Sequence, residues 1–516
     1  MKKQTKLLAV LSTAALLAIG ASMTSFAATG WAEEDGTWVY YNRDGERATD
    51  SWKKSGNNWY YLDSDGEMAI DQLIEDGDNY YYVDINGVMA SNQWVAIENE
   101  DAGNDDEPDQ NWYYFQANGK ALKNGDNSKV ALKTINGKKY AFDDEGKMLY
   151  GWVDEDSAER VDDTDSDGFK EGDYYFGGED DGAMTVGWLQ MDITYDEATN
   201  DYEIAPVFNE DEDQTRWFYF KSNGKMIKSD EGDRTKDKTI NGKKYAFDQY
   251  GAMVAEWSLD EGDLGTSPNA FTSNVTSSAE VVTGKAFDSK YTESWKYFNS
   301  VEDGARVSKG WFKVVPAEYL NEDKYNDDED FWYYADGSGN LYAGEFKTIK
   351  GKKYAFRNDG RMINGLKFIK EGTNDFEDVI ADDDDNHSFD NEDDFLAQAS
   401  TYFEGEGYKC YYFGGGDDGA MRTNKTTVEI DGENHNFYFE KSGSKKGAGV
   451  TGEKDDKLYQ SGMLLKADSD DKYVVVDKTT KYTTNAAGEK VLDYVTYNKL
   501  DDAKEFMAQD DVLESN

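Results

Sequence analysis

Cysteine, proline and histidine are scarce in this chain of 516 residues, which has one Cys, four Pro and two His. A single thiol, Cys410, cannot close a disulfide within the chain. The two histidines, His387 and His435, belong to no Cys/His constellation. The sequence also lacks a G-x-S-x-G motif and a phosphate-binding glycine loop. These absences favour a binding function over catalysis.

Positive charge is also in short supply. Lys and Arg total 55 against 106 Asp and Glu, which leaves a net charge of −51. Such a surface repels nucleic acid and anionic lipid and attracts cations. Aromatic residues make up 14% of the chain, and this content argues against a purely acidic disordered protein.

Long apolar runs are confined to the N-terminus. Residues 7–19 are apolar apart from Ser12 and Thr13; they follow three lysines and precede Ser25-Phe26-Ala27. This pattern predicts a secretory signal peptide at residues 1–27, because a membrane-spanning helix needs about 20 apolar residues. We therefore expect a secreted protein with no membrane attachment after signal cleavage.

A 16-residue stretch organises the rest of the chain. It reads KTINGKKYAFDDEGKM at residues 133–148, and near copies occupy residues 238–253 and 347–362. Asn136-Gly137 is a tight-turn dipeptide, because Gly accepts a positive φ without a Cβ clash. Tyr140 and Phe142 are two residues apart and so share one face of a strand. A unit this short cannot bury its aromatic face alone, so it must stack on neighbouring units.

Related units recur near the N-terminus at intervals of 21 residues, opened by Trp31, Trp52, Leu73 and Trp94. Seven residues after the first two openings come Trp38 and Trp59, each heading an aromatic run that ends in an Asp-Gly turn. This order predicts one β-hairpin in each unit of about 20 residues.

The predicted fold is therefore all-β: an elongated solenoid of aromatic β-hairpins with acidic loop insertions. We divide the chain into a signal peptide at 1–27, regular repeats at 28–93, blocks of long, short and long units with acidic inserts at 94–425, degenerate repeats at 426–492 and a C-terminal tail at 493–516. The largest inserts are residues 258–294 and 367–409, of which residues 382–394 are nearly all acidic and expected to be solvated loop. The last 16 residues are expected to be a frayed helix or disordered.

The first units resemble a known family. Its pattern is carried by Gly30-Trp31, Trp38-Val39-Tyr40-Tyr41 and Asp44-Gly45, then by Ser51-Trp52, Trp59-Tyr60-Tyr61 and Asp65-Gly66-Glu67-Met68. These residues resemble the choline-binding, or cell-wall-binding, repeat family, and the glucan-binding repeats of secreted glucosyltransferases look similar. The resemblance covers roughly residues 30–490. It implies a β-hairpin solenoid, a Gram-positive surface location and non-covalent binding to cell-wall polymers.

Two Trp from one hairpin and an aromatic residue from the next can enclose a quaternary ammonium, because the face of an aromatic ring attracts a cation. The alternative is that the rings only cover one another as core. The resemblance implies ligand-binding residues at Trp31, Trp38 and Tyr61, at Trp52, Trp59, Tyr82 and Met68, at Trp188 and Trp217, and at Trp311 and Trp332. In the short units Lys139, Lys244 and Lys353 replace the inner Trp, so we expect those units to be structural spacers.

One acidic insert has the spacing of a calcium-binding loop. Asp163, Asp165 and Asp167 precede Gly168 in a D-x-D-x-D-G pattern. Position 12 of an EF-hand would fall on Tyr174, so the loop is not an EF-hand. Two interpretations stay open: a calcium site formed by the three carboxylates, and a solvated acidic loop. No other cofactor is expected.

The predicted function is that of a secreted, non-catalytic surface protein that binds cell-wall teichoic acid or wall glycan through aromatic sites between hairpins. One alternative is an extracellular α-glucan-binding protein, whose rings would stack on sugars. Another is a structural adhesin or spacer whose acidic loops bind calcium or a host partner. Exposed edge hairpins at the ends of the array also favour pairing of two chains into a homodimer.

Overall fold

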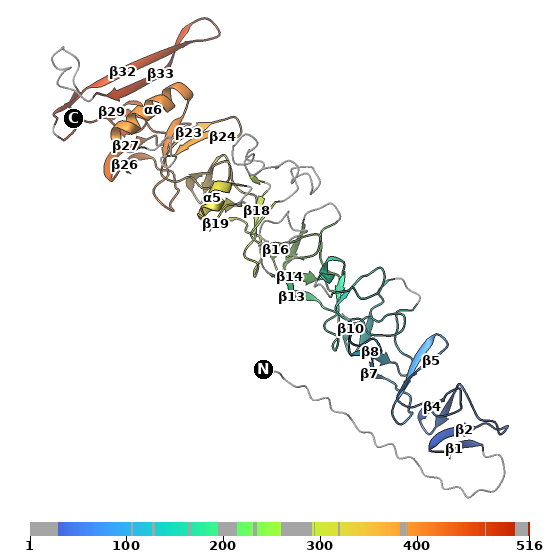
Figure 1. Cartoon of the computed structure of the whole chain (residues 1–516). Coiled ribbons are helices and arrows are strands. Elements are labelled where there is room, and N and C mark those ends of the chain that lie inside the picture. Colours follow the sequence, from blue (N-terminus) through green and yellow to red (C-terminus); the bar gives the residue numbers. More distant parts are fainter. Residues whose placement is uncertain are drawn as a thin grey trace. The chain divides into compact units, whose positions relative to one another are not determined.

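The computed structural model forms two compact units, Met1–Glu197 with Trp217–Ile227 (unit 1) and Ala198–Arg216 with Lys228–Asn516 (unit 2). The structure describes residues 29–104, 107–125, 129–163, 167–193, 214–230, 235–259, 292–293, 295–317, 320–381, 389, 391–469, 471–500 and 514–515. The predicted signal peptide lies outside these residues, as does most of the insert at 258–294. Figure 1 labels the elements along the chain.

Unit 1 is a series of two-stranded sheets, each formed by strands that follow one another in sequence. The pairs are β1 (Gly30–Glu34) with β2 (Thr37–Tyr41), β3 (Ser51–Ser55) with β4 (Asn58–Leu62), β5 (Gln72–Asp76) with β6 (Asn79–Val83), β7 (Gln93–Glu98) with β8 (Gln110–Phe115), β9 (Lys133–Ile135) with β10 (Lys138–Tyr140), β11 (Trp152–Val153) with β12 (Tyr174–Tyr175), and β13 (Gly187–Ile193) with β14 (Gln214–Phe220). A short 3-10 helix, η1 (Gly168–Lys170), precedes β12.

Unit 2 begins with the same kind of hairpin. The pairs are β15 (Lys236–Ile240) with β16 (Lys243–Phe247), β17 (Trp257–Leu259) with β18 (Trp295–Tyr297), β19 (Gly310–Val314) with β20 (Phe331–Ala335), and β21 (Phe346–Ile349) with β22 (Lys352–Ala355). A short helix, α5 (Glu322–Asn326), lies in the insert between β19 and β20. Strands and hairpins dominate the described residues, so the all-β, hairpin-repeat prediction is confirmed.

The C-terminal part of unit 2 departs from the two-stranded pattern. Its sheets are β24 (Phe376–Ala381), β23 (Leu366–Glu371) and β25 (Lys409–Tyr412) in that order, and β26 (Asn424–Ile430), β27 (Glu433–Phe439), β30 (Met463–Leu464), β29 (Lys457–Gln460) and β28 (Gly452–Lys454) in that order. Two further pairs are β32 (Val476–Thr484) with β33 (Lys490–Lys499) and β31 (Tyr473–Val474) with β34 (Glu514–Ser515). Strand β33 runs across residue 493, where the sequence placed the start of the tail, and residues 514–515 pair with β31. Residues 501–513 and 516, for which a frayed helix or disorder was expected, lie outside the described residues.

The described parts of the insert at 367–409 are folded, and the expectation that residues 382–394 form solvated loop is wrong at its C-terminal end. Residues 382–388 and 390 lie outside the described residues. Helix α6 (Glu392–Glu406) begins at that C-terminal end, with the Asn391 side chain accepting a hydrogen bond from the Asp394 amide. Its acidic first turn suits the positive end of the helix dipole. The helix contacts β23, β25, β29 and β33 (Figure 1), and the buried rings of Phe368, Phe395 and Phe437 join it to the sheets.

The hairpin turns follow from the sequence. Asn136 and Gly137 have φ values of 50° and 85°, as a two-residue turn with positive φ at both positions requires. At the end of the second strand many repeats have one completely buried residue, as Leu62, Val83, Phe115, Phe142 and Phe356 show. These buried residues form the core of the repeats. Among the described residues, no helix has both the length and the apolar character needed to cross a membrane.

In many repeats a backbone hydrogen bond joins the hairpin to the one before it. The Met68 amide donates to the Trp38 carbonyl over 2.8 Å, and Met362 donates to Trp332 over 2.7 Å. The Met side chain then packs on the turn glycine of the following unit: a Cβ built on Gly87 would lie 3.0 Å from the Met68 sulfur. Thus a methionine two residues after a turn glycine contacts both the preceding and the following repeat.

An aspartate opens many of the second turns and caps the loop that follows. Asp143 Oδ1 accepts from the amides of Glu145 (3.0 Å) and Lys147 (2.7 Å). Burial raises the pKa of Asp143 to about 6, and the backbone hydrogen bond from Lys147 opposes that rise. The folded chain therefore holds a proton at pH 5 that an unfolded aspartate, with a pKa near 3.9, has lost.

The stabilising contribution of Asp143 is thus fully present below about pH 4 and is lost as pH rises through about 6. We expect Asp143→Asn to remove about 2–3 kcal/mol of pH dependence between pH 4 and 7. Urea unfolding of both proteins across this range measures it, and Asp144→Asn at the adjacent exposed residue is the matched control. Parallel pH profiles for wild type and Asp143→Asn would contradict the assignment.

Candidate functional site: aromatic sites between hairpins

The tryptophans fall into two groups by burial. Trp152, Trp257 and Trp295 are 1%, 5% and 1% exposed and belong to the core. The other ten keep part of the ring surface accessible, and Trp59 is 41% exposed. Core packing therefore leaves part of most of these rings uncovered, and the accessible ones are candidates for ligand contact.

In the first two hairpins the opening Trp lies between two tyrosines. The Trp31 ring is 5.4 Å from Tyr40 in its own hairpin and 5.3 Å from Tyr60 in the next. Trp52 is 5.1 Å from Tyr61 and 5.0 Å from Tyr81. The inner tryptophans Trp38 and Trp59 lie on the second strands, two residues from the cross-strand partners of Trp31 and Trp52.

The aromatic residue that the following hairpin contributes is thus one position earlier in the sequence than predicted. Tyr61, expected beside Trp31, lies on Trp52, and Tyr82, expected beside Trp52, stacks on Phe115 at 6.1 Å. Successive strand residues point to opposite faces, so a shift of one residue changes which ring is presented. Met68 packs on Gly87, so its side chain makes a contact between two successive repeats.

A fuller site lies between β7, β8 and β10. Trp94 and Trp112 both pack against the buried cluster that contains Tyr140 and Phe142, and the Trp94 ring centroid is 4.9 Å from Tyr140. The Trp112 indole N–H donates to Asp180 Oδ1 over 3.2 Å. We call Trp94, Trp112, Tyr140 and Asp180 the Trp94 site. It combines aromatic walls with a carboxylate at the edge.

Unit 2 repeats this arrangement. Trp311 and Trp332 have ring centroids 6.3 Å apart and nearly perpendicular planes, and Trp311 is 4.8 Å from Tyr354. The Trp332 indole N–H donates to Asp417 Oδ1 over 2.9 Å. We call Trp311, Trp332, Tyr354 and Asp417 the Trp311 site. Its third wall comes from the short unit, as in the Trp94 site.

Trp188 and Trp217 are also brought together, with ring centroids 6.2 Å apart at 90°. The rings meet although an insert separates the two residues in sequence, as one also separates Trp311 from Trp332; residues 194–213 of the first insert lie outside the described residues. The sequence therefore identified both pairs correctly as neighbours. Ligand binding by the eleven residues expected to bind stays a prediction.

The short units contribute more than spacing. Sequence reasoning missed Tyr140, Tyr354, Trp94, Trp112 and the two aspartates as site residues. The signal for the tyrosines was present, because each KTING-type stretch carries a Tyr next to its inner Lys. The aspartates had a signal too: GGEDDGAM at 177–184 and GGGDDGAM at 414–421 are near copies.

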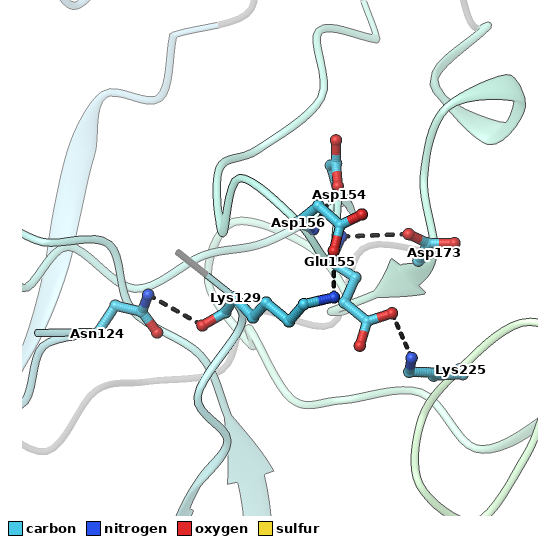
Figure 2. A network of polar contacts seen from close by, with 7 residues as sticks. All are labelled: Asn124, Lys129, Asp154, Glu155, Asp156, Asp173 and Lys225. Carbon is cyan, nitrogen blue, oxygen red and sulfur yellow. Dashed lines mark hydrogen bonds and ion pairs between the residues drawn. The ribbon is translucent and has the colours of Figure 1, made fainter. Parts of the chain in front are cut away.

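The acidic inserts are partly held by lysines. Figure 2 shows one such network in unit 1, where Lys129 bonds Asp156 over 2.5 Å and Lys225 pairs with Glu155. The Glu155 amide also donates to Asp173 over 3.2 Å. These contacts join the β11–β12 insert to the segments before β9 and after β14, so this acidic loop has a structural role.

The suggested calcium loop is only partly described. Asp163 Oδ1 accepts a hydrogen bond from the Gly168 amide over 2.9 Å, and Asp167 precedes η1. Asp165 lies outside the described residues. Within those residues, no group of three or more His, Cys, Asp or Glu is arranged to hold a metal ion. Calcium binding by Asp163, Asp165 and Asp167 stays a prediction.

Comparisons with known proteins agree with this geometry. The chain matches a choline-binding repeat model at residues 48–94 and a cell wall binding repeat model at residues 109–121 and 213–226. It is 26% identical over 288 residues to glucosyltransferase-S of Streptococcus mutans, an alignment that covers 50% of this chain and 16% of that enzyme.

Two solved structures from Streptococcus pneumoniae are also similar. The modular autolysin LytC with a synthetic peptidoglycan ligand is 18% identical, covers 66% of this chain and 54% of its own, and gives a TM-score of 0.32. Choline-binding protein F is 17% identical, covers 86% of this chain and 100% of its own, and gives a TM-score of 0.22. The chain therefore carries repeats of the choline-binding, or cell-wall-binding, type at residues 48–94, 109–121 and 213–226.

Proposed function

We propose that this protein is secreted and attaches to a cell-wall polymer by binding choline-like cationic groups at its aromatic sites. The Trp94 site is the observation that carries the proposal. Two half-buried indoles, a tyrosine from the next hairpin and a carboxylate bonded to one indole converge there. Choline-binding and cell-wall-binding repeats are typical of surface or secreted proteins of Gram-positive bacteria.

The chemistry of the site suits a quaternary ammonium. Such a group has no hydrogen-bond demand and gains about 0.5–2 kcal/mol from each aromatic face. The negative Asp180 carboxylate also attracts the ammonium, and the net charge of −51 attracts cations from a distance. Each site alone would be weak, but several sites on one chain strengthen attachment to a polymer that carries many ligands.

We expect the chain to be retained on a diethylaminoethyl resin and to be eluted by free choline at constant ionic strength. Trp94→Ala with Trp112→Ala should elute at a lower choline concentration, because one site is lost while the others remain. Elution by sodium chloride is the control, since the acidic surface also binds an amine resin as an ion exchanger. Equal choline elution for variant and wild type would contradict a role for the Trp94 site.

The second candidate is binding to an extracellular α-glucan. The relative named glucosyltransferase-S and the 41% exposed ring of Trp59 favour it, because a flat accessible indole can stack on a sugar ring. Retention on cross-linked dextran that free isomaltose reverses would support this reading over choline. Retention on neither matrix, with stability that depends on calcium, would favour the adhesin or spacer.

A further inference from the structure

One position in each hairpin faces the inner aromatic residue across the two strands. Its occupants differ in charge from unit to unit. Glu33 pairs with Trp38, Lys54 with Trp59, Glu75 with Tyr80, Ala96 with Trp112 and Lys313 with Trp332. We call it the cross-strand position. Directly paired residues in a hairpin have side chains in contact range on the same face, so this residue borders each aromatic site.

Where the position holds a lysine, its ammonium lies in the site. The Lys54 Nζ is 5.7 Å from the centroid of the Trp59 ring, a cation–π distance. The Lys313 Nζ lies 3.1 Å from Asp417 Oδ1, the carboxylate that accepts from the Trp332 indole. In both hairpins the chain supplies its own cation beside the inner tryptophan.

The Trp94 site differs at this position. Ala96 is uncharged, and within the described part of the chain Asp180 has no ion-pair partner; it accepts only from the Trp112 indole. The neighbouring Asp181 is paired with Lys138 over 3.2 Å, which secures the loop. The Trp94 and Trp311 sites have equivalent aromatic walls and equivalent carboxylates, Asp180 and Asp417, but only in the Trp311 site does a lysine contact the carboxylate.

We propose that the cross-strand position decides whether an aromatic site accepts a cationic ligand. Ala96 leaves Asp180 available to a quaternary ammonium, whereas Lys313 and Lys54 act as built-in competitors that exclude one. The proposal rests on the proposed function, since it assigns the choline-type ligand to particular sites. It adds that sites with similar aromatic walls differ in whether they accept a cationic ligand.

The test is fluorine NMR of the full chain labelled with 5-fluorotryptophan, titrated with choline and with its neutral isostere 3,3-dimethylbutan-1-ol. Signals are assigned through Trp112→Phe and Trp332→Phe. In wild type we expect choline to shift the Trp112 signal and not the Trp332 signal. Lys313→Ala should make Trp332 respond to choline, and Ala96→Lys should weaken choline binding at Trp112 by about tenfold.

Binding of the neutral isostere should not change in Lys313→Ala or Ala96→Lys, because an uncharged ligand is neither repelled by the lysine nor attracted by the aspartate. Lys324→Ala is the matched control, since it removes a lysine of unit 2 whose ion pairs are with Asp327 and Glu329. Choline shifts at both Trp112 and Trp332 in wild type, or exchanges without effect, would overturn this inference while leaving the proposed function intact. No response of any tryptophan to choline would overturn both.

Discussion

Replacing Trp152 with alanine is expected to lower the free energy of unfolding of unit 1 by about 3–5 kcal/mol. The indole is 1% exposed, and its ring centroid lies 5.5 Å from Phe218 and 5.1 Å from Tyr175. A Cβ built on Gly168 or Gly172 would lie 2.8 or 2.7 Å from the indole. Because the backbone is closed around the ring on this side, little can move in to fill the cavity.

The matched control is Trp59→Ala. The residue is 41% exposed, so truncation removes less buried area than at Trp152 and should cost about 2 kcal/mol or less. Urea unfolding followed by circular dichroism, with amide hydrogen exchange of residues 152–176, measures both variants. If Trp59→Ala destabilises the chain as much as Trp152→Ala, the division of the tryptophans into core and accessible groups is wrong.

The second large effect is expected for Gly419→Ala. Gly419 has a φ of 57°, and the Met362 side chain lies where a Cβ would be placed. Backbone strain of about 1 kcal/mol adds to an overpacking cost of about 1–3 kcal/mol. We therefore expect a loss of about 2–4 kcal/mol in stability for unit 2, measured by urea unfolding.

Two further variants separate the two costs. Gly351→Ala also introduces Cβ at a positive φ, of 82°, but nothing lies within 4 Å of that atom, so it should show the backbone cost alone. Gly419→Ala combined with Met362→Ala should be less destabilised than the sum of the single variants by about 1 kcal/mol or more, since contacting residues couple. If the losses of stability in the two single variants simply add up in the double variant, contact with the Met362 side chain is not the reason why position 419 requires a glycine.

The sequence by itself determined the hairpin repeat. The alternation of Tyr140 and Phe142 sets which side chains are buried, and Asn136-Gly137 sets the turn, because both act within one pair of strands. The same local logic placed Trp311 beside Trp332 despite the insert between them, since two strands that pair in register bring their tryptophans to one face. The family resemblance rested on these local features and is confirmed by the repeat matches.

Only the tertiary structure decided which residues of different hairpins meet. The offset between stacked hairpins presents Tyr60 to Trp31 in place of Tyr61, and no periodicity within a hairpin encodes that offset. Asp180 reaches Trp112 across 68 residues, and α6 arises within an acidic insert because sheets β23 to β30 offer an apolar surface to its buried face. These contacts depend on how separate elements pack, which the spacing of residues along one strand leaves open.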